Sequence, residues 1–247
     1  MNIIRVILFK ILGIKCYLRL VSRTFVKLTS WGFMKDRNPE LFYLHTIVKP
    51  GFYCLDIGAN LGYYSVKLSN IVGEKGKVFS VEPVPMFNEI WKRNIKVSKY
   101  NNAELLPYAL GEKAQTIQMG TPVISGVLHH GMTKVIEDKT KENYVQFYDV
   151  EMKNPDELFL NLERLDFIKI DIEGYESIVF ANIINTLKKH RPIIQSELGG
   201  DENRKKVIEI LREIGYTPKL LINGELVVAS EQDIKEKDQD FYFIPTK

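Results

Sequence analysis

Apolar and amphipathic segments alternate along most of the chain. Five short apolar runs have the pattern of buried strands, and they lie at residues 51–58, 76–83, 103–110, 165–174 and 191–198. Segments with helical periodicity lie at residues 62–73, 86–99, 176–187 and 203–215. Strands that alternate with helices in this way predict an α/β fold, with a mostly parallel sheet covered by helices on both faces.

The C-terminal part departs from this alternation. Asn223 and Gly224 stand between two apolar runs, which is the strongest short signal for a β-hairpin. A further apolar run at residues 240–246 is expected to form an edge strand or to pair with that hairpin. The sheet is therefore expected to finish in an antiparallel hairpin.

Residues 111–149 show weaker periodicity than the rest of the chain. We interpret them as an inserted loop region over the carboxyl edge of the sheet, where α/β folds bind ligands. The resulting organisation is a basic amphipathic helical segment over residues 1–40, followed by a main domain over residues 41–247.

The N-terminal segment is distinguished by its charge. Residues 1–35 contain seven lysines and arginines and no acidic residue. The apolar runs between these charges are much shorter than the ~20 residues that a membrane-spanning helix needs, and no signal-peptide cleavage site is evident. Two hypotheses remain open. The helix packs on its own domain with a solvated basic side, or it makes a peripheral contact with an anionic membrane surface.

Composition narrows the class of protein only slightly. A formal net charge of +3 over 247 residues is too small to indicate nucleic acid as the main partner. The two cysteines, Cys16 and Cys54, lie far apart and show no zinc-binding spacing. Reduced thiols of this kind suit a cytoplasmic protein, so any membrane contact is expected at the inner face.

The turn after the first strand carries the clearest chemistry. It consists of residues Gly58, Ala59, Asn60, Leu61 and Gly62. A dinucleotide-binding turn has the pattern G-x-G-x-x-G, because bare backbone N–H groups at a helix N-terminus bind the pyrophosphate. Here Asn60 stands where a glycine would be, and Asp56 precedes the turn. The Asp56 carboxylate suits the ammonium group of S-adenosylmethionine, reached directly or through water. The pattern therefore predicts S-adenosylmethionine as the ligand.

Two further strand ends are expected to complete the cofactor site. Glu82 ends the second strand, where its carboxylate can accept hydrogen bonds from both ribose hydroxyls. Ala109 and Leu110 end the third strand and are expected beside the adenine.

The fourth strand ends in a dense group of charges. Asp171 and Glu173 lie at its carboxyl end, and Lys169 lies on the same side of the strand as Asp171. Two carboxylates near a sulfonium could act electrostatically, hold a divalent metal or accept a proton, and one of them could instead cap the following helix. Glu197 occupies the comparable position on the fifth strand and is a weaker candidate.

Two histidines in the 111–149 region are further candidates for a catalytic base. His129 and His130 are adjacent there, and an imidazole titrates near neutral pH. A position of either ring within reach of Asp171 would support this role.

With these residues in view, the chain resembles the FkbM-type methyltransferases, a branch of the Rossmann-like (class I) S-adenosylmethionine-dependent enzymes. The matching pieces are "DIGANLGYYS", "VEPVPMFNEIWKRNI" and "FIKIDIEGYE", with weaker support from "RPIIQSEL". The resemblance covers roughly residues 51–198. It implies a seven-stranded sheet ending in a reversed strand, so that residues 41–247 would form the methyltransferase domain.

The resemblance also implies site roles and a reaction. The cofactor contacts would be Asp56, Gly58, Asn60, Gly62 and Glu82, with Asp171 beside the transferred methyl group. The implied activity is O-methylation of a hydroxyl, often on a sugar of a polysaccharide or glycolipid, or on a natural product. Three alternatives stay open: an inactive methyltransferase fold serving as a scaffold in glycan assembly, a methyltransferase of RNA or protein, and an NAD-dependent dehydrogenase.

Overall fold

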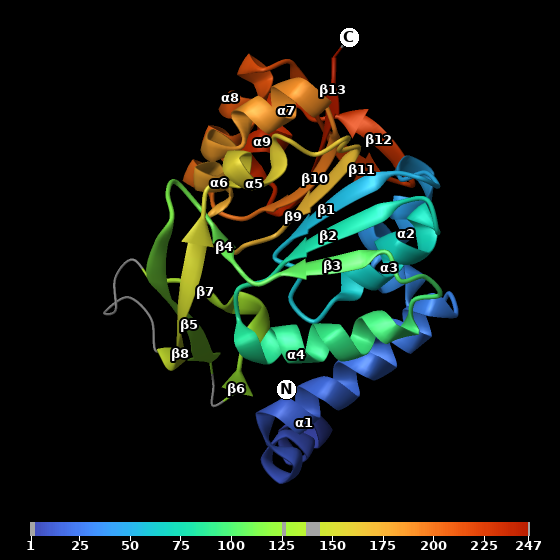
Figure 1. The fold of residues 1–247 in the computed structure, drawn as a ribbon, viewed down its shortest axis with the longest axis vertical. Helices are drawn as coiled ribbons and strands as arrows, with labels where there is room; N and C mark the ends of the chain where they lie inside the picture. Colours follow the sequence, from blue (N-terminus) through green and yellow to red (C-terminus); the bar gives the residue numbers. More distant parts are fainter. Residues whose placement is uncertain (1–2, 125–126, 137–143, 247) are drawn as a thin grey trace.

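The computed structural model describes residues 3–124, 127–136 and 144–246. Within them, eight strands form one large sheet in the order β12-β11-β13-β10-β9-β1-β2-β3 (Figure 1). The parallel strands are β1 (Tyr53–Ile57), β2 (Lys77–Val81), β3 (Ala103–Leu106), β9 (Phe167–Ile170) and β10 (Ile193–Leu198). The antiparallel strands are β11 (Tyr216–Ile222), β12 (Glu225–Val228) and β13 (Gln239–Pro245). The expected α/β fold with a C-terminal hairpin is confirmed.

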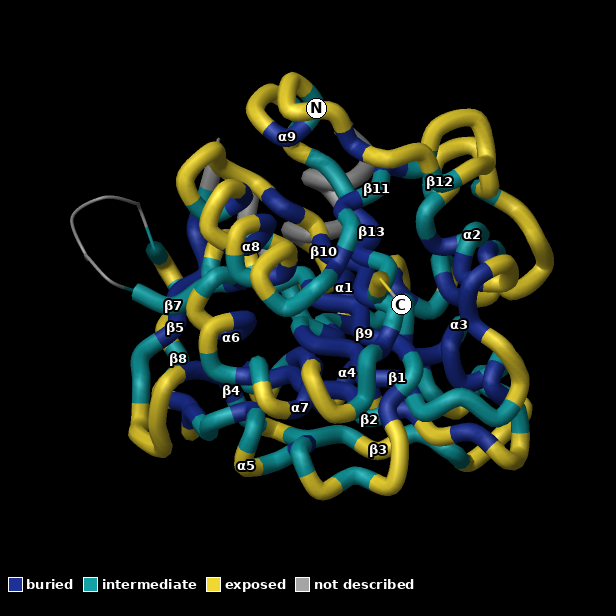
Figure 2. Tube along the Cα trace, turned by 90° about the horizontal axis from the view of Figure 1, so that it is seen from above, coloured by how far each residue is buried: buried dark blue, intermediate teal, exposed yellow. Residues whose placement is uncertain are grey.

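Helices cover both faces of this sheet. The α-helices are α1 (Ile3–Ser30), α2 (Pro39–Ile47), α3 (Tyr63–Val72), α4 (Pro85–Asn94), α5 (Pro155–Phe159), α6 (Glu176–Asn182), α7 (Ile184–His190), α8 (Asp201–Glu213) and α9 (Glu231–Glu236). Neighbouring residues of β1 enter opposite cores: Cys54 packs with α2 and α3, whereas Leu55 packs with α6, α7 and α8. Strands buried on both faces, such as β9 (Figure 2, dark blue), explain the continuous apolar runs in the sequence.

The C-terminal strands differ in detail from the expected arrangement. The sheet has eight strands in the described residues rather than seven, because both arms of the hairpin, β11 and β12, pair at its edge. The last run, β13, pairs with the hairpin arm β11, which was one of the two expected placements, and it lies between β10 and β11 rather than at the edge. Its three consecutive aromatic residues, Phe241, Tyr242 and Phe243, are each 0% exposed. A strand buried on both faces in this way belongs inside a sheet.

Residues 111–149 are not a loop region where the structure describes them. β5 (Gln115–Ile124) and β8 (Tyr144–Lys153) form a long antiparallel pair, joined by β4 (Ala109–Leu110), β6 (Val127–Leu128) and β7 (Lys134–Val135) in a second, smaller sheet. Figure 1 shows this sheet beside the carboxyl ends of the parallel strands. Side chains of β8 alternate between exposed and covered. The weak apolar pattern therefore reflects strands with one solvated face.

The basic helix α1 is docked on the rest of the fold. It is kinked at Gly13, which has a φ of 68° and a ψ of 164°. Beyond the kink, Tyr17 and Leu18 are buried and pack with residues of α4. Lys15 pairs with Glu89 of α4 at 2.5 Å. The described part of α1 therefore packs on its own domain, while contact of its basic residues with a membrane surface stays a prediction.

No helix in the described part of the chain is long and apolar enough to cross a membrane.

Candidate functional site

The turn between β1 and α3 contains two glycines with positive φ angles. Gly58 has a φ of +79°, and a Cβ built there would lie 1.9 Å from the backbone oxygen of Asp171. Gly62 has a φ of +88°, and its Cβ would lie 2.9 Å from Cδ1 of Trp91. The first glycine thus lets the end of β1 lie directly against the segment that follows β9. The backbone at both positions favours glycine, because L side chains rarely adopt these angles.

A pocket of about 610 Å³, counting the space open to solvent, lies at the carboxyl ends of the parallel strands. Seven of the residues singled out in the sequence line it: Gly58, Asn60, Glu82, Ala109, Leu110, Asp171 and Glu173. The second sheet supplies a further wall through Met119, Thr133 and Val135. The 111–149 region therefore contributes to this pocket, although as strands and short turns rather than as a loop.

Glu82 is held rigidly at the end of β2. Its Oε2 accepts the backbone N–H of Asn60 at 2.9 Å, and its Oε1 accepts the backbone N–H of Val84 at 2.8 Å. Burial raises the pKa of Glu82 to about 7, although these two hydrogen bonds lower it. A carboxylate oxygen has two acceptor positions, so each oxygen keeps one for a ligand hydroxyl. The residue can therefore receive the two hydroxyls of a ribose.

Asn60 lines the pocket together with Glu82 and has a side-chain oxygen that accepts no hydrogen bond from the described residues. Its backbone adopts the left-handed region, with a φ of 48°. Its side-chain Oδ1 is buried and has no hydrogen-bond partner among the described residues. A buried polar atom without a partner is costly, so this atom marks a position where a polar ligand group would bind.

Asp56 occupies a different place from the one expected. It is 2% exposed and does not line the pocket. Its Oδ2 accepts the hydroxyl of Ser65 at 2.5 Å, and the Ser65 oxygen in turn accepts the Trp91 indole N–H at 2.8 Å. Burial raises the pKa of Asp56 to about 6. The carboxylate thus braces the start of α3, and its contact with an ammonium group stays a prediction.

Ala59 and Gly62 also lie outside the pocket lining and shape the turn instead. The Ala59 N–H donates to Val81 O at 3.0 Å, and the Gly62 N–H donates to Ala59 O at 2.8 Å. The first bond joins the turn to the end of β2, and the second closes the turn itself.

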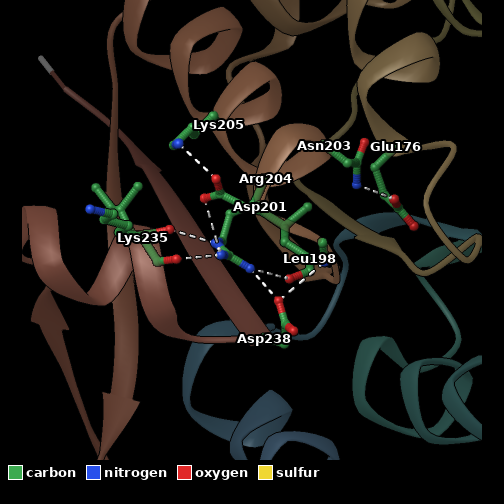
Figure 3. Close-up of polar contacts among 10 residues, drawn as sticks. Glu176, Leu198, Asp201, Asn203, Arg204, Lys205, Lys235 and Asp238 are labelled. Carbon is green, nitrogen blue, oxygen red and sulfur yellow. Dashed lines mark hydrogen bonds and ion pairs between the residues drawn. The ribbon is translucent and has the colours of Figure 1, made fainter.

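The segment after β9 is positioned by a residue that the sequence did not single out. Oε1 of Glu176 accepts the backbone N–H of Ile172 at 2.9 Å and that of Gly174 at 3.3 Å. Its Oε2 accepts Nδ2 of Asn203 on α8 at 2.7 Å (Figure 3). Glu176, rather than Asp171 or Glu173, is therefore the acid that binds the free N–H groups before α6. A carboxylate in the first turn of a helix is the signal that could have indicated this.

A cluster of carboxylates lies at the ends of β9, β10 and β13, and two of its members, Asp171 and Glu173, line the pocket. Glu173 and Glu197 are exposed, and desolvation with the charge of Asp171 raises the pKa of each to about 7. Asp240 lies in register with Glu197 across the β10–β13 pair. The cluster thus brings together carboxylates from the ends of three strands, and desolvation together with their mutual repulsion raises the pKa values of Glu173 and Glu197.

One buried cation offsets this charge. Lys169 is 2% exposed, and its Nζ lies 3.1 Å from Oδ1 of Asp240 and 3.9 Å from Oδ2 of Asp171. Burial alone would lower the pKa of Lys169, but the two carboxylates raise it above its usual value. The described residues include no group of three or more His, Cys, Asp or Glu arranged to hold a metal ion. The suggested divalent metal is therefore not supported by this donor set.

Arg204 fixes the strand end that carries Glu197. It is 2% exposed, and Figure 3 shows its guanidinium among carbonyls and carboxylates of three segments. It donates to the backbone oxygens of Leu198, Ile234 and Lys235 and pairs with Asp238. This residue ties β10 to the segment that leads into β13, and the sequence pattern gave no indication of it.

Of the two candidate histidines, the structure describes only the side chain of His129. This residue does not line the pocket, and its backbone N–H donates to Pro122 O at 3.0 Å. His130 begins the short helix η3 (His130–Met132), and its side chain lies outside the described part of the structure. The geometry therefore favours a carboxylate over His129 as a base.

Comparison with known proteins assigns the family. Residues 56–218 match the model of the methyltransferase FkbM domain, which is more than half of the chain. The chain belongs to the FkbM methyltransferase family. The resemblance stated from the sequence is thereby confirmed, and with it the expectation of an S-adenosylmethionine-dependent methyltransferase at the level of the family.

Individual relatives share shorter or more distant similarity with this FkbM-family chain. It is 24% identical over 148 residues to the protein-L-isoaspartate O-methyltransferase of Caenorhabditis elegans, covering 57% of the chain and 64% of that protein. It is 30% identical over 59 residues to that of Methanothrix thermoacetophila, covering 24% of the chain and 28% of that protein. The chain thus spans less than two thirds of the length of these curated relatives.

A solved structure of the FkbM methyltransferase from Methylobacillus flagellatus is 15% identical, covering 82% of this chain and 50% of that one, with a TM-score of 0.48. The strand order described above, rather than this likeness, establishes the fold of our FkbM-family chain. Its pocket residues fit the family's methyl donor, since Glu82 has acceptor positions for a ribose and Asn60 has a free one for a polar group.

Proposed function

We propose that this FkbM-family protein transfers a methyl group from S-adenosylmethionine to a hydroxyl of a polar acceptor. A sugar of a polysaccharide or glycolipid, or a natural product, is the acceptor class that we favour. One observation carries the proposal: a single pocket joins the ribose-type acceptor Glu82 to the carboxylates Asp171 and Glu173. The donor would be held at one end and the acceptor hydroxyl deprotonated at the other.

The donor end is built for an adenosyl group. Glu82 would accept the ribose hydroxyls, and Ala109 and Leu110, which are 6% and 4% exposed, would contact the adenine. Asn60 Oδ1 would gain the partner that it lacks. Held in this way, the donor would present its sulfonium methyl toward Asp171.

When bound, S-adenosylmethionine supplies a methyl group whose bond to sulfur breaks as the acceptor oxygen attacks in line, so that the bonding electrons pass to sulfur. The protein's contribution is to hold the two reactants in this geometry and to receive the hydroxyl proton. Glu173 is suited to the second task, because a carboxylate with a pKa of about 7 is a stronger base than an ordinary glutamate at neutral pH.

The carboxylates next to the pocket suit an acceptor rich in hydroxyl groups. Glu197 and Asp240 stand beside Asp171, which lines the pocket, and their carboxylates are hydrogen-bond acceptors for such groups. A nucleic acid would meet this negative charge with its phosphates, which argues against RNA. The scaffold alternative is weakened because Asn60, Glu82, Ala109 and Leu110, which are expected to bind the donor, line one pocket.

Methyl transfer from label-carrying S-adenosylmethionine tests the proposal. Sugar hydroxyls, peptides and RNA would be offered in parallel, and the labelled products would then be treated with mild alkali. A methyl ether survives this treatment, whereas a carboxyl methyl ester is hydrolysed. We expect alkali-stable label on a hydroxylated acceptor. If alkali released the label, or if the label appeared only on peptide or RNA, the proposed hydroxylated acceptor would be wrong.

A further inference from the structure

A second concave region, which we call the basic groove, lies between α1 and α4 and apart from the cofactor pocket. It encloses about 850 Å³, counting the space open to solvent. Its lining residues are Arg19 and Arg23 of α1, Ile90, Arg93 and Asn94 of α4, and Lys96 of η2 (Ile95–Val97). Four of these six residues are cationic and none is acidic.

The positive charge of the basic groove is largely uncompensated. Glu89 pairs with Arg19 at 3.3 Å, but it pairs with Lys15 as well. Arg23 donates to the backbone oxygen of Arg93 at 2.7 Å, which is a neutral acceptor. Arg93 and Lys96 are exposed, and neither forms an ion pair with another described residue.

The groove also contains a donor that lacks an acceptor. Nε of Arg19 is buried and has no hydrogen-bond partner among the described residues. Guanidinium groups suit the oxygens of a phosphate, because several N–H donors can bind them at once. The basic groove therefore has the donors and the charge to hold a phosphate group.

Three exposed apolar side chains, which we call the apolar ridge, lie on α1 or just after it. Leu20 of α1 is 50% exposed, and Trp31, which directly follows α1, is 70% exposed. Phe33, just after the helix, is 59% exposed. Figure 1 shows α1 along the lower edge of the molecule, with α4 on its inner side.

We propose that α1, the apolar ridge and the basic groove form a docking surface for an anionic lipid bilayer. A lipid phosphate would occupy the groove, while Leu20, Trp31 and Phe33 would enter the headgroup region. The charge pattern supports this occupant, because residues 1–35 carry seven basic residues and no acidic one.

This surface is connected to the cofactor pocket through the core. Tyr17 and Leu18 of α1 pack in one cluster with Val84 and Phe87, and both of the latter residues line the pocket. Docking would thus hold the pocket near the bilayer. The inference does not depend on the acceptor class proposed above.

Vesicle flotation of the full chain tests the proposal. We expect flotation with phosphatidylcholine vesicles that contain phosphatidylglycerol, and none with pure phosphatidylcholine. The double substitution R93Q/K96Q removes two exposed charges of the groove and should lower the partition coefficient by roughly 30-fold, since each basic residue near the surface contributes about 1 kcal/mol. W31S/F33S should lower it as well.

A matched control changes the same number of charges elsewhere. Lys113 and Lys188 are exposed, and Lys188 lies on α7, at the opposite end of the molecule from α1 (Figure 1). K113Q/K188Q should float like the unaltered chain. Unchanged thermal unfolding of R93Q/K96Q would show that its fold is intact.

Several results would overturn the proposal. These are absence of flotation with anionic vesicles, equal flotation with neutral vesicles, and equal losses in R93Q/K96Q and K113Q/K188Q. Binding of inorganic phosphate without vesicle binding would identify a small-anion site instead. Retention on RNA in place of vesicles would likewise exclude the bilayer as the occupant.

Discussion

Glu176 and Asn203 are joined by a hydrogen bond of 2.7 Å, and through it α8 holds the segment that follows β9. The other oxygen of Glu176 accepts two backbone N–H groups of that segment. Because Asp171 and Glu173 lie in the same segment, the position of both carboxylates depends on a residue that itself does not line the pocket.

Replacement of Glu176 should therefore impair catalysis more than donor binding. E176A removes an acceptor that is 1% exposed and leaves two N–H groups without a partner, at a cost of roughly 1–3 kcal/mol. We expect a fall in kcat of at least about tenfold, with the affinity for S-adenosylhomocysteine changed much less. E176Q keeps an oxygen acceptor and serves as the control. Equal kcat values for E176A and the unaltered chain would contradict this role.

Glu82 should control donor affinity. Removing its carboxylate in E82A deprives the ribose of its acceptors, and we expect a loss of roughly 10- to 100-fold in affinity for S-adenosylhomocysteine, measured by calorimetry. E104A, at an exposed residue of β3, provides a matched control. If both variants bound the ligand equally well, the ribose contact assigned to Glu82 would be wrong.

Glu82 should also make stability depend on pH in the absence of donor. Burial raises its pKa in the folded protein to about 7, from an ordinary value of 4.5. Between these two values the folded state holds more protons than the unfolded state, so stability falls as the pH rises through this range and levels off above it. The contribution is on the order of 3 kcal/mol.

The corresponding measurement compares chemical denaturation of the unaltered chain and of E82Q at several pH values from 5 to 8. E82Q cannot titrate at this position, so its stability should fall less over the range. If the free energy of unfolding changed equally with pH in both proteins, the raised pKa of Glu82 would be wrong.

Glu173 should appear in the pH dependence of the rate. With its pKa near 7, it accepts a proton only above that value, so kcat should rise with pH and level off beyond about pH 7. E173Q should lower kcat and abolish this rise. E197Q is the informative comparison, because the pKa of Glu197 is also raised to about 7. Loss of the rise in E197Q alone would transfer the role of base to Glu197.

Gly58 should tolerate no side chain. Its Cβ would meet the backbone of Asp171, and its φ of +79° disfavours other residues, so G58A should destabilise the protein by at least about 2 kcal/mol. At Gly199 a Cβ would meet nothing within 4 Å and the φ is not positive, so G199A is the control. Thermal unfolding compares the two variants. Similar midpoints would show that the end of β1 can move away from β9.

Much of the fold could be predicted because parallel strands are buried on both faces. Runs such as residues 165–174 are apolar enough to be recognised in isolation, and Asn223 with Gly224 marked the hairpin. The second sheet escaped prediction because β8 keeps a solvated face and pairs with β5, which lies far from it along the chain. The place of β13 between two distant strands is likewise set by tertiary packing.

In the site, too, residues that follow a local sequence pattern could be predicted, whereas residues positioned by distant contacts could not. Gly58, Glu82 and Asp171 could be expected together, since the carboxyl ends of neighbouring parallel strands meet at one edge of a sheet. The hydrogen bond from Ser65 to Asp56 could not be expected, because Ser65 lies nine residues later and on another element, and the ligand contact of Asp56 stays a prediction. Arg204 acts through contacts with residues up to 34 positions away, which no local pattern reveals. For Glu176 the only local signal is its place in the first turn of α6, and its contact with Asn203 lies 27 positions away.

The most direct test of the central claim is calorimetric titration of the full chain with S-adenosylhomocysteine and, separately, with NAD. The pocket described here predicts saturable binding of S-adenosylhomocysteine at one site per chain, weakened in E82A, and no binding of NAD. Tight binding of NAD, or no binding of S-adenosylhomocysteine, would contradict the assignment of this pocket to a methyl donor.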